Sequence, residues 1–234
     1  MKEVYLSVNI MTWNTGITEN LFDCDKCNKI LDYVDEFLKK EDAIVFLQQI
    51  VYKDPQMNWA KHEICNVLLD KFQKYTVKFY SRSSFMMTVA IASGEGFREL
   101  DDSFLPVGRP KNRSIAVKFH NLTFLGIHAE NGKDNGPFLK SIPDKADVIL
   151  GDFNAGNYLE SDNRKIFNSI LNRYVCICNM PTKITESGRR TCIDHIFVKK
   201  DIITRCSNLI VHEEIKLSDH YPITFEICNK TNDV

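Results

Sequence analysis

A carboxylate and a carboxamide stand two residues apart in the stretch Gly151-Asp152-Phe153-Asn154. This stretch directly follows residues 146–150, a mostly apolar run with the length of a buried strand. Because side chains alternate along extended backbone, Asp152 and Asn154 are expected to share one face at a strand end. A carboxylate oxygen suits Mg²⁺ or Mn²⁺, and an amide can bind water or a phosphate oxygen. The tetrapeptide alone is equally compatible with an Asx turn after a strand.

Five further stretches place side chains of the same kinds beside apolar segments. They are Thr12-Trp13-Asn14, Phe46-Leu47-Gln48-Gln49, Gly126-Ile127-His128, Cys192-Ile193-Asp194-His195-Ile196-Phe197 and Leu217-Ser218-Asp219-His220-Tyr221-Pro222. Each stretch alone is a weak signal, because an Asp-His pair before a strand is more often a turn or a cap. Six such stretches in one chain favour a common site for a metal ion and a phosphate group.

The hydrophobic pattern predicts the elements that must position these side chains. Strands are expected at residues 4–12, 43–47, 75–80, 85–92, 114–119, 122–128, 146–150, 192–198, 209–212 and 221–228. Helices are expected at residues 25–40, 59–72, 137–142 and 161–172. No linker or repeat divides the chain, so we expect one α/β domain over residues 1–234. Its expected architecture is a four-layered α-β-β-α sandwich of two packed, mostly antiparallel sheets with outer helices.

The composition is typical of a globular protein, with 234 residues, 44% of them hydrophobic and 26% charged. A formal net charge of −1 neither indicates nor excludes a nucleic-acid partner, because a local basic rim can serve a neutral protein. No apolar run approaches transmembrane length, and the first residues do not resemble a signal peptide. We therefore expect a cytoplasmic protein without a membrane partner.

Eight cysteines include the pairs Cys24/Cys27 and Cys176/Cys178. A zinc site would need both pairs to meet in space, across a connection far longer than a usual structural-zinc loop. Scattered cysteines of a cytosolic protein are mostly buried apolar residues. We expect structural thiols, and neither a zinc site nor a redox motif.

The order and content of the motifs resemble the endonuclease/exonuclease/phosphatase superfamily, which includes deoxyribonuclease I and the abasic-site endonucleases. The resemblance runs from Trp13-Asn14 to Ser218-Asp219-His220-Tyr221-Pro222-Ile223 and so covers nearly the whole chain. The motifs Gly-Asp-Phe-Asn and Ser-Asp-His-x-Pro-Ile are together quite specific for the superfamily, although they do not identify the substrate.

The resemblance implies a role for each motif residue. Asp219, the side chain at position 49 and Asn14 would hold Mg²⁺ or Mn²⁺. Asp152 would orient or deprotonate the attacking water, and Asn154 would hold water or a phosphate oxygen. His220, its tautomer fixed by Asp194, would bind or protonate the phosphate, with His128 as a second phosphate-facing residue. Arg113 would bind phosphate through its planar guanidinium.

One position departs from the pattern of the superfamily. The motif at Leu47-Gln48 continues there with a glutamate, the main metal-binding acid, but this chain has Gln49. An amide keeps one oxygen ligand and loses the charge, so Mg²⁺ is expected to bind more weakly. The chain is either a natural variant with altered metal use or one altered to stop catalysis, and of these two hypotheses we favour the second.

The basic rim consists of Arg109, Lys111, Arg113, Lys183, Arg189 and Arg190. The segment 181–191 could follow a nucleic-acid backbone, and it is equally compatible with an ordinary solvated loop. The resemblance favours a divalent-metal-dependent phosphodiester hydrolase, a nuclease acting on DNA, RNA or oligonucleotides. The alternatives are a phosphatase or phosphodiesterase for a small molecule or lipid head group, and a degenerate binding module without catalysis.

Overall fold

The computed structural model of the chain describes residues 5–17, 24–50, 64–79, 87–107, 113–155, 165, 167–168, 170 and 172–230. The strands of one sheet are β1 (Tyr5–Ile17), β2 (Ala43–Ile50), β3 (Thr76–Lys78), β4 (Met87–Ala92), β13 (Cys206–Val211) and β14 (Ile223–Lys230). Those of the other are β5 (Arg98–Glu99), β6 (Ser114–Phe119), β7 (Leu122–His128), β8 (Val148–Asp152), β9 (Tyr174–Cys176) and β12 (Asp194–Lys199). A separate two-stranded ribbon joins β10 (Lys183–Ile184) and β11 (Arg190–Thr191).

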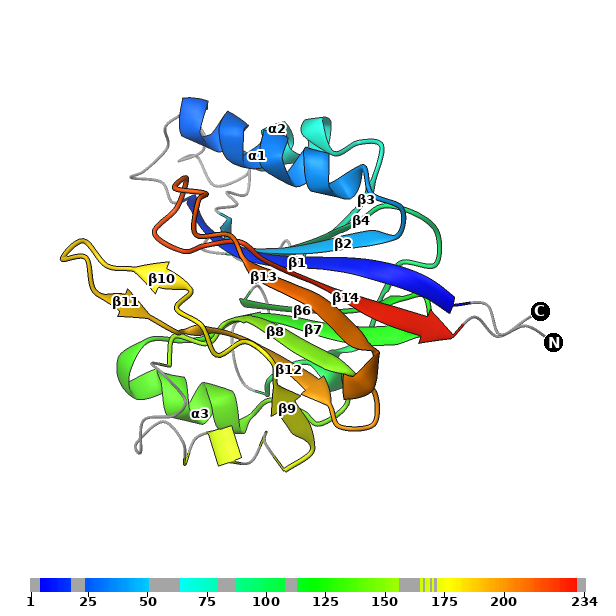
Figure 1. Cartoon of the computed structure of the whole chain (residues 1–234), viewed down its shortest axis with the longest axis vertical. Coiled ribbons are helices and arrows are strands. Elements are labelled where there is room, and N and C mark those ends of the chain that lie inside the picture. Colours follow the sequence, from blue (N-terminus) through cyan, green and yellow to red (C-terminus); the bar gives the residue numbers. More distant parts are fainter. Residues whose placement is uncertain are drawn as a thin grey trace.

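Helices cover the outer face of each sheet (Figure 1). On one side lie α1 (Cys24–Leu38) and α2 (Ile64–Lys71), and on the other lies α3 (Asn135–Lys140). Short 3₁₀ helices span Asp102–Phe104, Gly132–Asp134 and Ile203–Arg205. The β10-β11 ribbon projects beyond one end of the two sheets (Figure 1). The predicted α-β-β-α sandwich is confirmed.

The strands are ordered β13-β14-β1-β2-β4-β3 in the first sheet and β5-β6-β7-β8-β12-β9 in the second. The pairs β1/β2 and β7/β8 are parallel, and the other neighbours are antiparallel. The mostly antiparallel character was therefore predicted correctly.

The hairpin at residues 114–119 and 122–128 and the pairing of β3 with β4 also agree with the sequence. β1 and β2 run past their predicted ends, to Ile17 and Ile50. The strands β5, β9, β10 and β11 have only two or three residues each, too few for a periodic pattern, and were missed. Residues 59–63 and most of the predicted helix 161–172 lie outside the described part.

Three hydrophobic layers follow from the alternation of side chains along the strands. Val8 and Ile10 of β1 point into the layer between the sheets, and Met11 and Trp13 point toward α1. In the second sheet, Leu150 faces the other sheet, and a third layer between this sheet and α3 contains Phe138. Burial of these three layers is the main stabilising term of the fold.

Two glycines allow the close contacts at the end of the sandwich. A Cβ on Gly126 would lie 2.4 Å from Cδ1 of Phe46, so the opposite sheet can approach only a glycine here. Gly151 has φ +129°, and a Cβ there would lie 2.1 Å from the backbone oxygen of Ile127. Both glycines therefore bring the strand ends carrying His128 and Asp152 into a tight arrangement.

Candidate active site

Three of the predicted residues form one row across the second sheet. His128 pairs with Asp152 in the parallel β7/β8 register, and Asp152 pairs with Asp194 in the antiparallel β8/β12 register. Residues in register point to the same face, here the face toward the other sheet. Asn14 of β1 meets them from that opposite sheet, and its Nδ2 donates to Oδ2 of Asp152 at 2.7 Å. The site is therefore built between the two sheets, at their common end.

Asp152 is the centre of this arrangement and is only 1% exposed. Besides the bond from Asn14, its Oδ1 accepts the backbone N–H of Asn154 at 2.8 Å. Nε2 of His128 and Nε2 of His220 each lie 3.9 Å from Oδ2 of Asp152, too far for a direct hydrogen bond. The carboxylate thus has two imidazoles within reach of a shared water or phosphate oxygen.

His220 is held from its other side by Asp194. Nδ1 of His220 lies 2.9 Å from Oδ2 of Asp194, and that carboxylate also accepts the hydroxyl of Thr182 at 2.6 Å. Because the Nδ1–H of His220 donates to Asp194, Nε2 of His220 is the nitrogen that faces Asp152. The predicted role of Asp194 as the residue that fixes the tautomer agrees with this geometry.

Burial and the nearby charges shift both titrating groups at the centre. Burial and then the charge of Asp194 raise the pKa of Asp152 to about 6, against the opposing effects of His220 and two hydrogen bonds. Burial alone would lower the pKa of His220, but Asp194 and Asp152 together raise it above its ordinary value. A carboxylate with a pKa near 6 is suited to accept a proton from water near neutral pH.

Asn154 lies next to Asp152 for a different reason than the one predicted. Its φ of +45° is left-handed, so the backbone after Asp152 is not extended and simple alternation does not apply. The bond from its N–H to Oδ1 of Asp152 is that of an Asx turn, and its Nδ2 donates to the backbone oxygen of Ala129 at 2.9 Å. The Asx turn, stated above as an alternative, is therefore present.

Asp219 lies at the mouth of the site, outside the buried row. Oδ2 of Asp219 is 2.9 Å from Nζ of Lys183, and the Asp219 side chain is 51% exposed. Partial burial alone would raise the pKa of Asp219, but His220 and Lys183 lower it below its ordinary value. Asp219 is therefore an ionised carboxylate with an ammonium group already bound to it.

Position 49 breaks the alternation of β2. Gln48 is fully buried and its side chain bonds with the hydroxyl of Thr12, whereas Gln49 is partly buried with a left-handed φ of +62°. Of the predicted metal ligands, Asn14 uses its Nδ2 on Asp152 and its Oδ1 on the N–H of Gly16.

The predicted metal-binding set of Asn14, Gln49 and Asp219 therefore fits a divalent cation poorly. It contains one carboxylate, and that carboxylate is neutralised by Lys183. A different group, formed by Asp152, Asp194 and His220, has one ligand atom from each residue within 4.8 Å of the others and could hold a metal ion. These three residues are buried and hydrogen-bonded to their neighbours.

The predicted phosphate-binding arginines are not gathered at Asp152. Nε of Arg113 lies 3.3 Å from a carboxylate oxygen of Glu130, and its Nη1 donates to the backbone oxygen of Ala129. It supports the backbone after His128. Arg190 forms an ion pair with Glu213, and Arg189 is exposed in the turn between β10 and β11. Arg109 and Lys111 lie outside the described residues.

Cys27 and Cys176, one from each cysteine pair, lie in different hydrophobic layers. Cys27 packs between the first sheet and α1, whereas Cys176 packs on the outer face of the second sheet. Burial raises the pKa of Cys176 to about 12 and that of Cys178 to about 11, so both remain protonated thiols. The expectation of buried apolar cysteines agrees with these environments.

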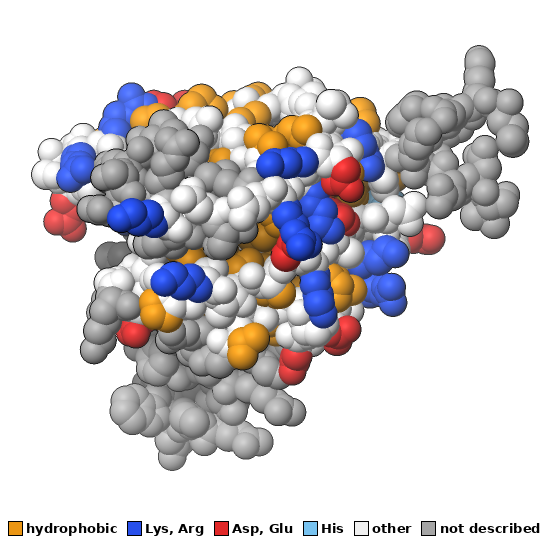
Figure 2. Space-filling view, turned by 90° about the horizontal axis from the view of Figure 1, so that it is seen from below, with side chains coloured by type: hydrophobic (Ala, Val, Ile, Leu, Met, Phe, Trp, Pro, Cys, Tyr) orange, Lys and Arg blue, Asp and Glu red, His pale blue; other side chains and the backbone are white. Residues whose placement is uncertain are grey.

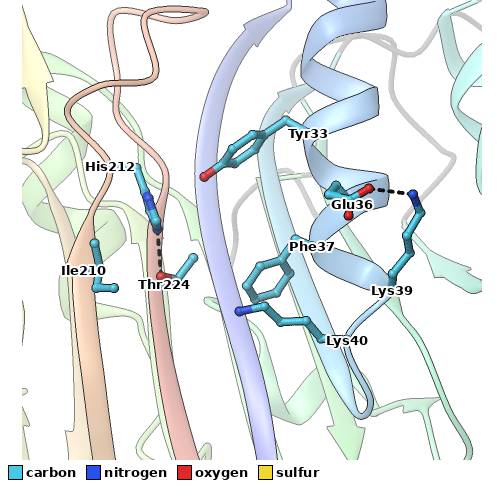
Figure 3. Close-up of a pocket in the computed structure, with 8 residues that line it drawn as sticks. All are labelled: Tyr33, Glu36, Phe37, Lys39, Lys40, Ile210, His212 and Thr224. Carbon is cyan, nitrogen blue, oxygen red and sulfur yellow. Dashed lines mark hydrogen bonds and ion pairs between the residues drawn. The ribbon is translucent and has the colours of Figure 1, made fainter.

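Lysines and arginines are interspersed with acids on the face seen from the α3 side (Figure 2). A separate hollow of about 470 Å³ opens on the outer face of the first sheet, between α1 and the strands β13 and β14 (Figure 3). Its lining includes Phe37, Ile210 and His212, and His212 is hydrogen-bonded to Thr224. None of the residues of the row around Asp152 lines this hollow.

Thr182, Trp13 and Ser218 support the site but were not assigned roles from the sequence. Nε1 of Trp13 donates to the backbone oxygen of His220 at 3.0 Å, and Oγ of Ser218 donates to that of Asn14 at 2.9 Å. Trp13 and Ser218 stand inside recognised motifs, so their positions were available as a signal. Thr182 precedes a two-residue strand and has no such signal.

Residues 137–224 match a family model described as "Endonuclease-reverse transcriptase". None of the curated proteins matches the sequence. Similar solved structures include a 3′-5′ exonuclease (NExo) from Neisseria meningitidis, with a TM-score of 0.66 and 16% identity over 94% of this chain and 99% of that chain. An AP endonuclease from Archaeoglobus fulgidus has a TM-score of 0.65 and 17% identity over 97% of this chain and 100% of that chain.

D. rerio TDP2, solved with a single-strand DNA product, has a TM-score of 0.62 and 16% identity over 96% of this chain and 99% of that chain. The two packed sheets with outer helices thus form an α/β sandwich whose fold is shared with these solved structures. The chain has the fold of the endonuclease/exonuclease/phosphatase superfamily, and the resemblance predicted from its motifs is confirmed. Among the described residues, no helix has both the length and the apolar character needed to cross a membrane.

Proposed function

We propose that this protein is a phosphodiester hydrolase acting on nucleic acid, carried by a single domain over residues 1–234. The observation that carries the proposal is the buried Asp152 carboxylate of β8, which accepts a hydrogen bond from Asn14 of the other sheet and has two imidazole nitrogens 3.9 Å from its Oδ2. The solved structures of an exonuclease, an AP endonuclease and a protein with bound DNA product support the substrate class. The cytosol is the proposed compartment, where its free thiols stay reduced.

The reaction follows from the charges around Asp152. A water bound at Oδ2 of Asp152 gives up its proton to the carboxylate and attacks the phosphorus in line with the leaving oxygen. The bond from phosphorus to the leaving oxygen breaks, and that oxygen takes up a proton from solvent. The phosphate oxygens gain negative charge in the transition state. Nε2 of His220, held by Asp194, donates to one of them, and Nε2 of His128 lies 3.9 Å from the same oxygen of Asp152 as Nε2 of His220 does.

A bound Mg²⁺ or Mn²⁺ supplies Lewis-acid stabilisation of a phosphate oxygen in reactions of this kind. In the predicted set, Asp219, Asn14 and Gln49 would hold it through one carboxylate and two amide oxygens. Because Asp219 is paired with Lys183 and Gln49 carries no charge, the steps above use only residues of the chain.

The proposal is tested by incubating the protein with plasmid DNA, RNA, a short single-stranded DNA and a panel of small phosphoesters. Each is tried with Mg²⁺, with Mn²⁺ and with a chelator, for the native chain and for Gln49→Glu. Nucleic-acid cleavage that disappears in Asp152→Asn supports the proposal. Turnover of small phosphoesters alone favours the small-molecule alternative, and binding of DNA without turnover in both forms favours the binding module.

A further inference from the structure

Lys183 is fixed beside Asp219 by the backbone, not only by its own ion pair. The segment around Lys183 runs antiparallel to the segment of Asp219 and His220. The N–H of Ile184 donates to the backbone oxygen of Asp219 at 2.8 Å, and the N–H of Tyr221 donates to that of Thr182 at 2.7 Å. These two bonds flank Lys183 and hold it next to His220.

The side chains of this short strand separate into an inner and an outer one. Thr182 is fully buried and bonds with Asp194 in the interior. Lys183, the next residue, points the other way and places Nζ 2.9 Å from Oδ2 of Asp219. Its side chain is 26% exposed and that of Asp219 is 51% exposed, so the ion pair lies where a ligand can approach it.

The Lys183–Asp219 pair adjoins the residues that contact Asp152. A Cβ added to Gly16 would lie 3.8 Å from Oδ1 of Asp219, so Asp219 is close to the backbone that follows Asn14. The hydroxyl of Ser218 donates to the backbone oxygen of Asn14. Asn14 in turn donates to Asp152. An ammonium group therefore stands at the mouth of the same site, on the side of Asn14 and His220.

The formal charges of the predicted metal-binding set and Lys183 sum to zero without a divalent ion. Of Asn14, Gln49 and Asp219, only Asp219 carries a charge, and Lys183 balances it. Mg²⁺ would have to displace the ammonium group and would gain one carboxylate and neutral oxygens, a weak set for a hard cation. An ammonium group has three donors, so Lys183 can bind Asp219 and still donate to a phosphate oxygen.

We propose that Lys183 is the resident cation of this site, neutralising Asp219 and binding the substrate phosphate in place of a divalent metal ion. This inference rests on the proposed hydrolysis of nucleic acid and deepens it. It favours the first of the two hypotheses for Gln49, a natural variant with altered metal use, because a neutral side chain there leaves Asp219 as the one charge of the predicted metal-binding set, already balanced by Lys183.

Lys199 provides a matched control. Its side chain is 27% exposed and its Nζ lies 3.2 Å from a carboxylate oxygen of Asp147, much like the pair of Lys183. Lys199 ends β12 at the opposite end of the strand from Asp194. The variants to compare are Lys183→Met, Lys183→Arg, Lys199→Met and the double variant Gln49→Glu/Lys183→Met.

The first readout is binding of a fluorescein-labelled single-stranded DNA in the presence of a chelator, followed by anisotropy. We expect Lys183→Met to weaken binding by about tenfold or more, which is the effect of losing one charged hydrogen bond. It should also reduce the slope of log affinity against log salt by about one phosphate contact. Lys199→Met should bind as the native protein does, and Lys183→Arg should keep most of the affinity. Unchanged binding and salt slope in a folded Lys183→Met would overturn the inference.

The second readout is the melting temperature with and without millimolar Mg²⁺, which needs no activity. Mg²⁺ should leave the native protein unchanged and should stabilise the double variant, where a second carboxylate is added and the ammonium is removed. If Mg²⁺ raises the melting temperature of the native protein as much as that of the double variant, Lys183 does not replace the metal. Should Lys183→Met fail to fold, Lys183→Met/Asp219→Asn avoids the unpaired carboxylate and is compared in the same two assays.

Activity separates this inference from the proposed function. The native protein should retain nucleic-acid cleavage in a chelator, and Lys183→Met should lose most of it. Cleavage that requires Mg²⁺ would overturn the role of Lys183 and leave the hydrolase intact. No cleavage of any substrate under any condition would instead refute the hydrolase, while the melting experiment would still decide on the cation.

Discussion

Acidification should destabilise this protein through one buried histidine outside the active site. His195 is fully buried, and its ring packs against Phe153, Phe167 and Phe197. Its Nε2 lies 3.4 Å from the backbone oxygen of Ala155, and the thiol sulfurs near its Nδ1 are protonated. Burial lowers the pKa of His195 from 6.5 to about 4, so the folded protein holds it neutral.

The direction in which stability changes with pH depends on whether the folded or the unfolded chain takes up the proton. Between about pH 6.5 and 4 the unfolded chain binds a proton at His195 and the folded chain does not, so stability falls as pH falls through that window. A shift of this size corresponds to about 3 kcal/mol in full, of which about 2 kcal/mol is lost by pH 5. Asp152 acts in the opposite direction, because its raised pKa makes the folded protein more stable at low pH.

Urea unfolding at a series of pH values from 8 down to about 5 measures the effect. His195→Gln serves as the comparison, because it cannot be charged and its amide can still donate to Ala155. The native protein should lose about 2 kcal/mol more than this variant between the two pH values. Equal losses in both proteins would refute the reasoning, and the contribution of Asp152 cancels in the comparison.

The remaining predictions concern the site and its supports. Asp152→Asn removes the proton acceptor, so it should lower turnover by a factor of at least about 10² while the melting temperature stays near the native value. Steady-state kinetics and thermal melting check this, and near-normal turnover would contradict the assignment. Gly126→Ala should destabilise the protein by about 1–3 kcal/mol, because its Cβ would meet Phe46 in the inter-sheet layer. Urea unfolding measures the loss of stability. Gly136→Ala is the control, because a Cβ there meets nothing within 4 Å. A chelator should leave the melting temperature unchanged and metal analysis should find no stoichiometric zinc, because Cys27 and Cys176 lie in different hydrophobic layers; zinc that survives dialysis would show this to be wrong.

Much of the frame was predictable because it depends on patterns that repeat along the chain. The β6-β7 hairpin has six and seven residues in its strands, enough for alternation to show. His128 and Asp152 stand at or just after the ends of predicted strands, so their convergence follows from strand ends meeting at one edge. Asp194 was predicted inside the strand 192–198, whereas β12 begins at this residue and pairs it with Asp152. The motifs around Asn14 and His220 then complete the group.

Other features depend on backbone geometry or contacts that carry no periodic signal. The left-handed residues Gln49 and Asn154 break the alternation from which their directions were inferred. The partner of Asp219 comes from β10, which has two residues, so the pairing with Lys183 could not be anticipated from spacing. Arg113 was predicted to bind phosphate, yet its nearest acid is Glu130, a neighbour set by the turn after His128.

The hydrogen bond from Asn14 to Asp152 also affects whether the site must rearrange when substrate binds. It links β1 of one sheet to β8 of the other, and the N–H of Asn154 grips the same carboxylate from the chain that follows. A group held from both sheets needs little rearrangement when the substrate arrives, so the described part of the site is ready before encounter. Turnover limited by chemistry in such a rigid site should be insensitive to the viscosity of the solvent, unlike turnover that waits for a loop to close.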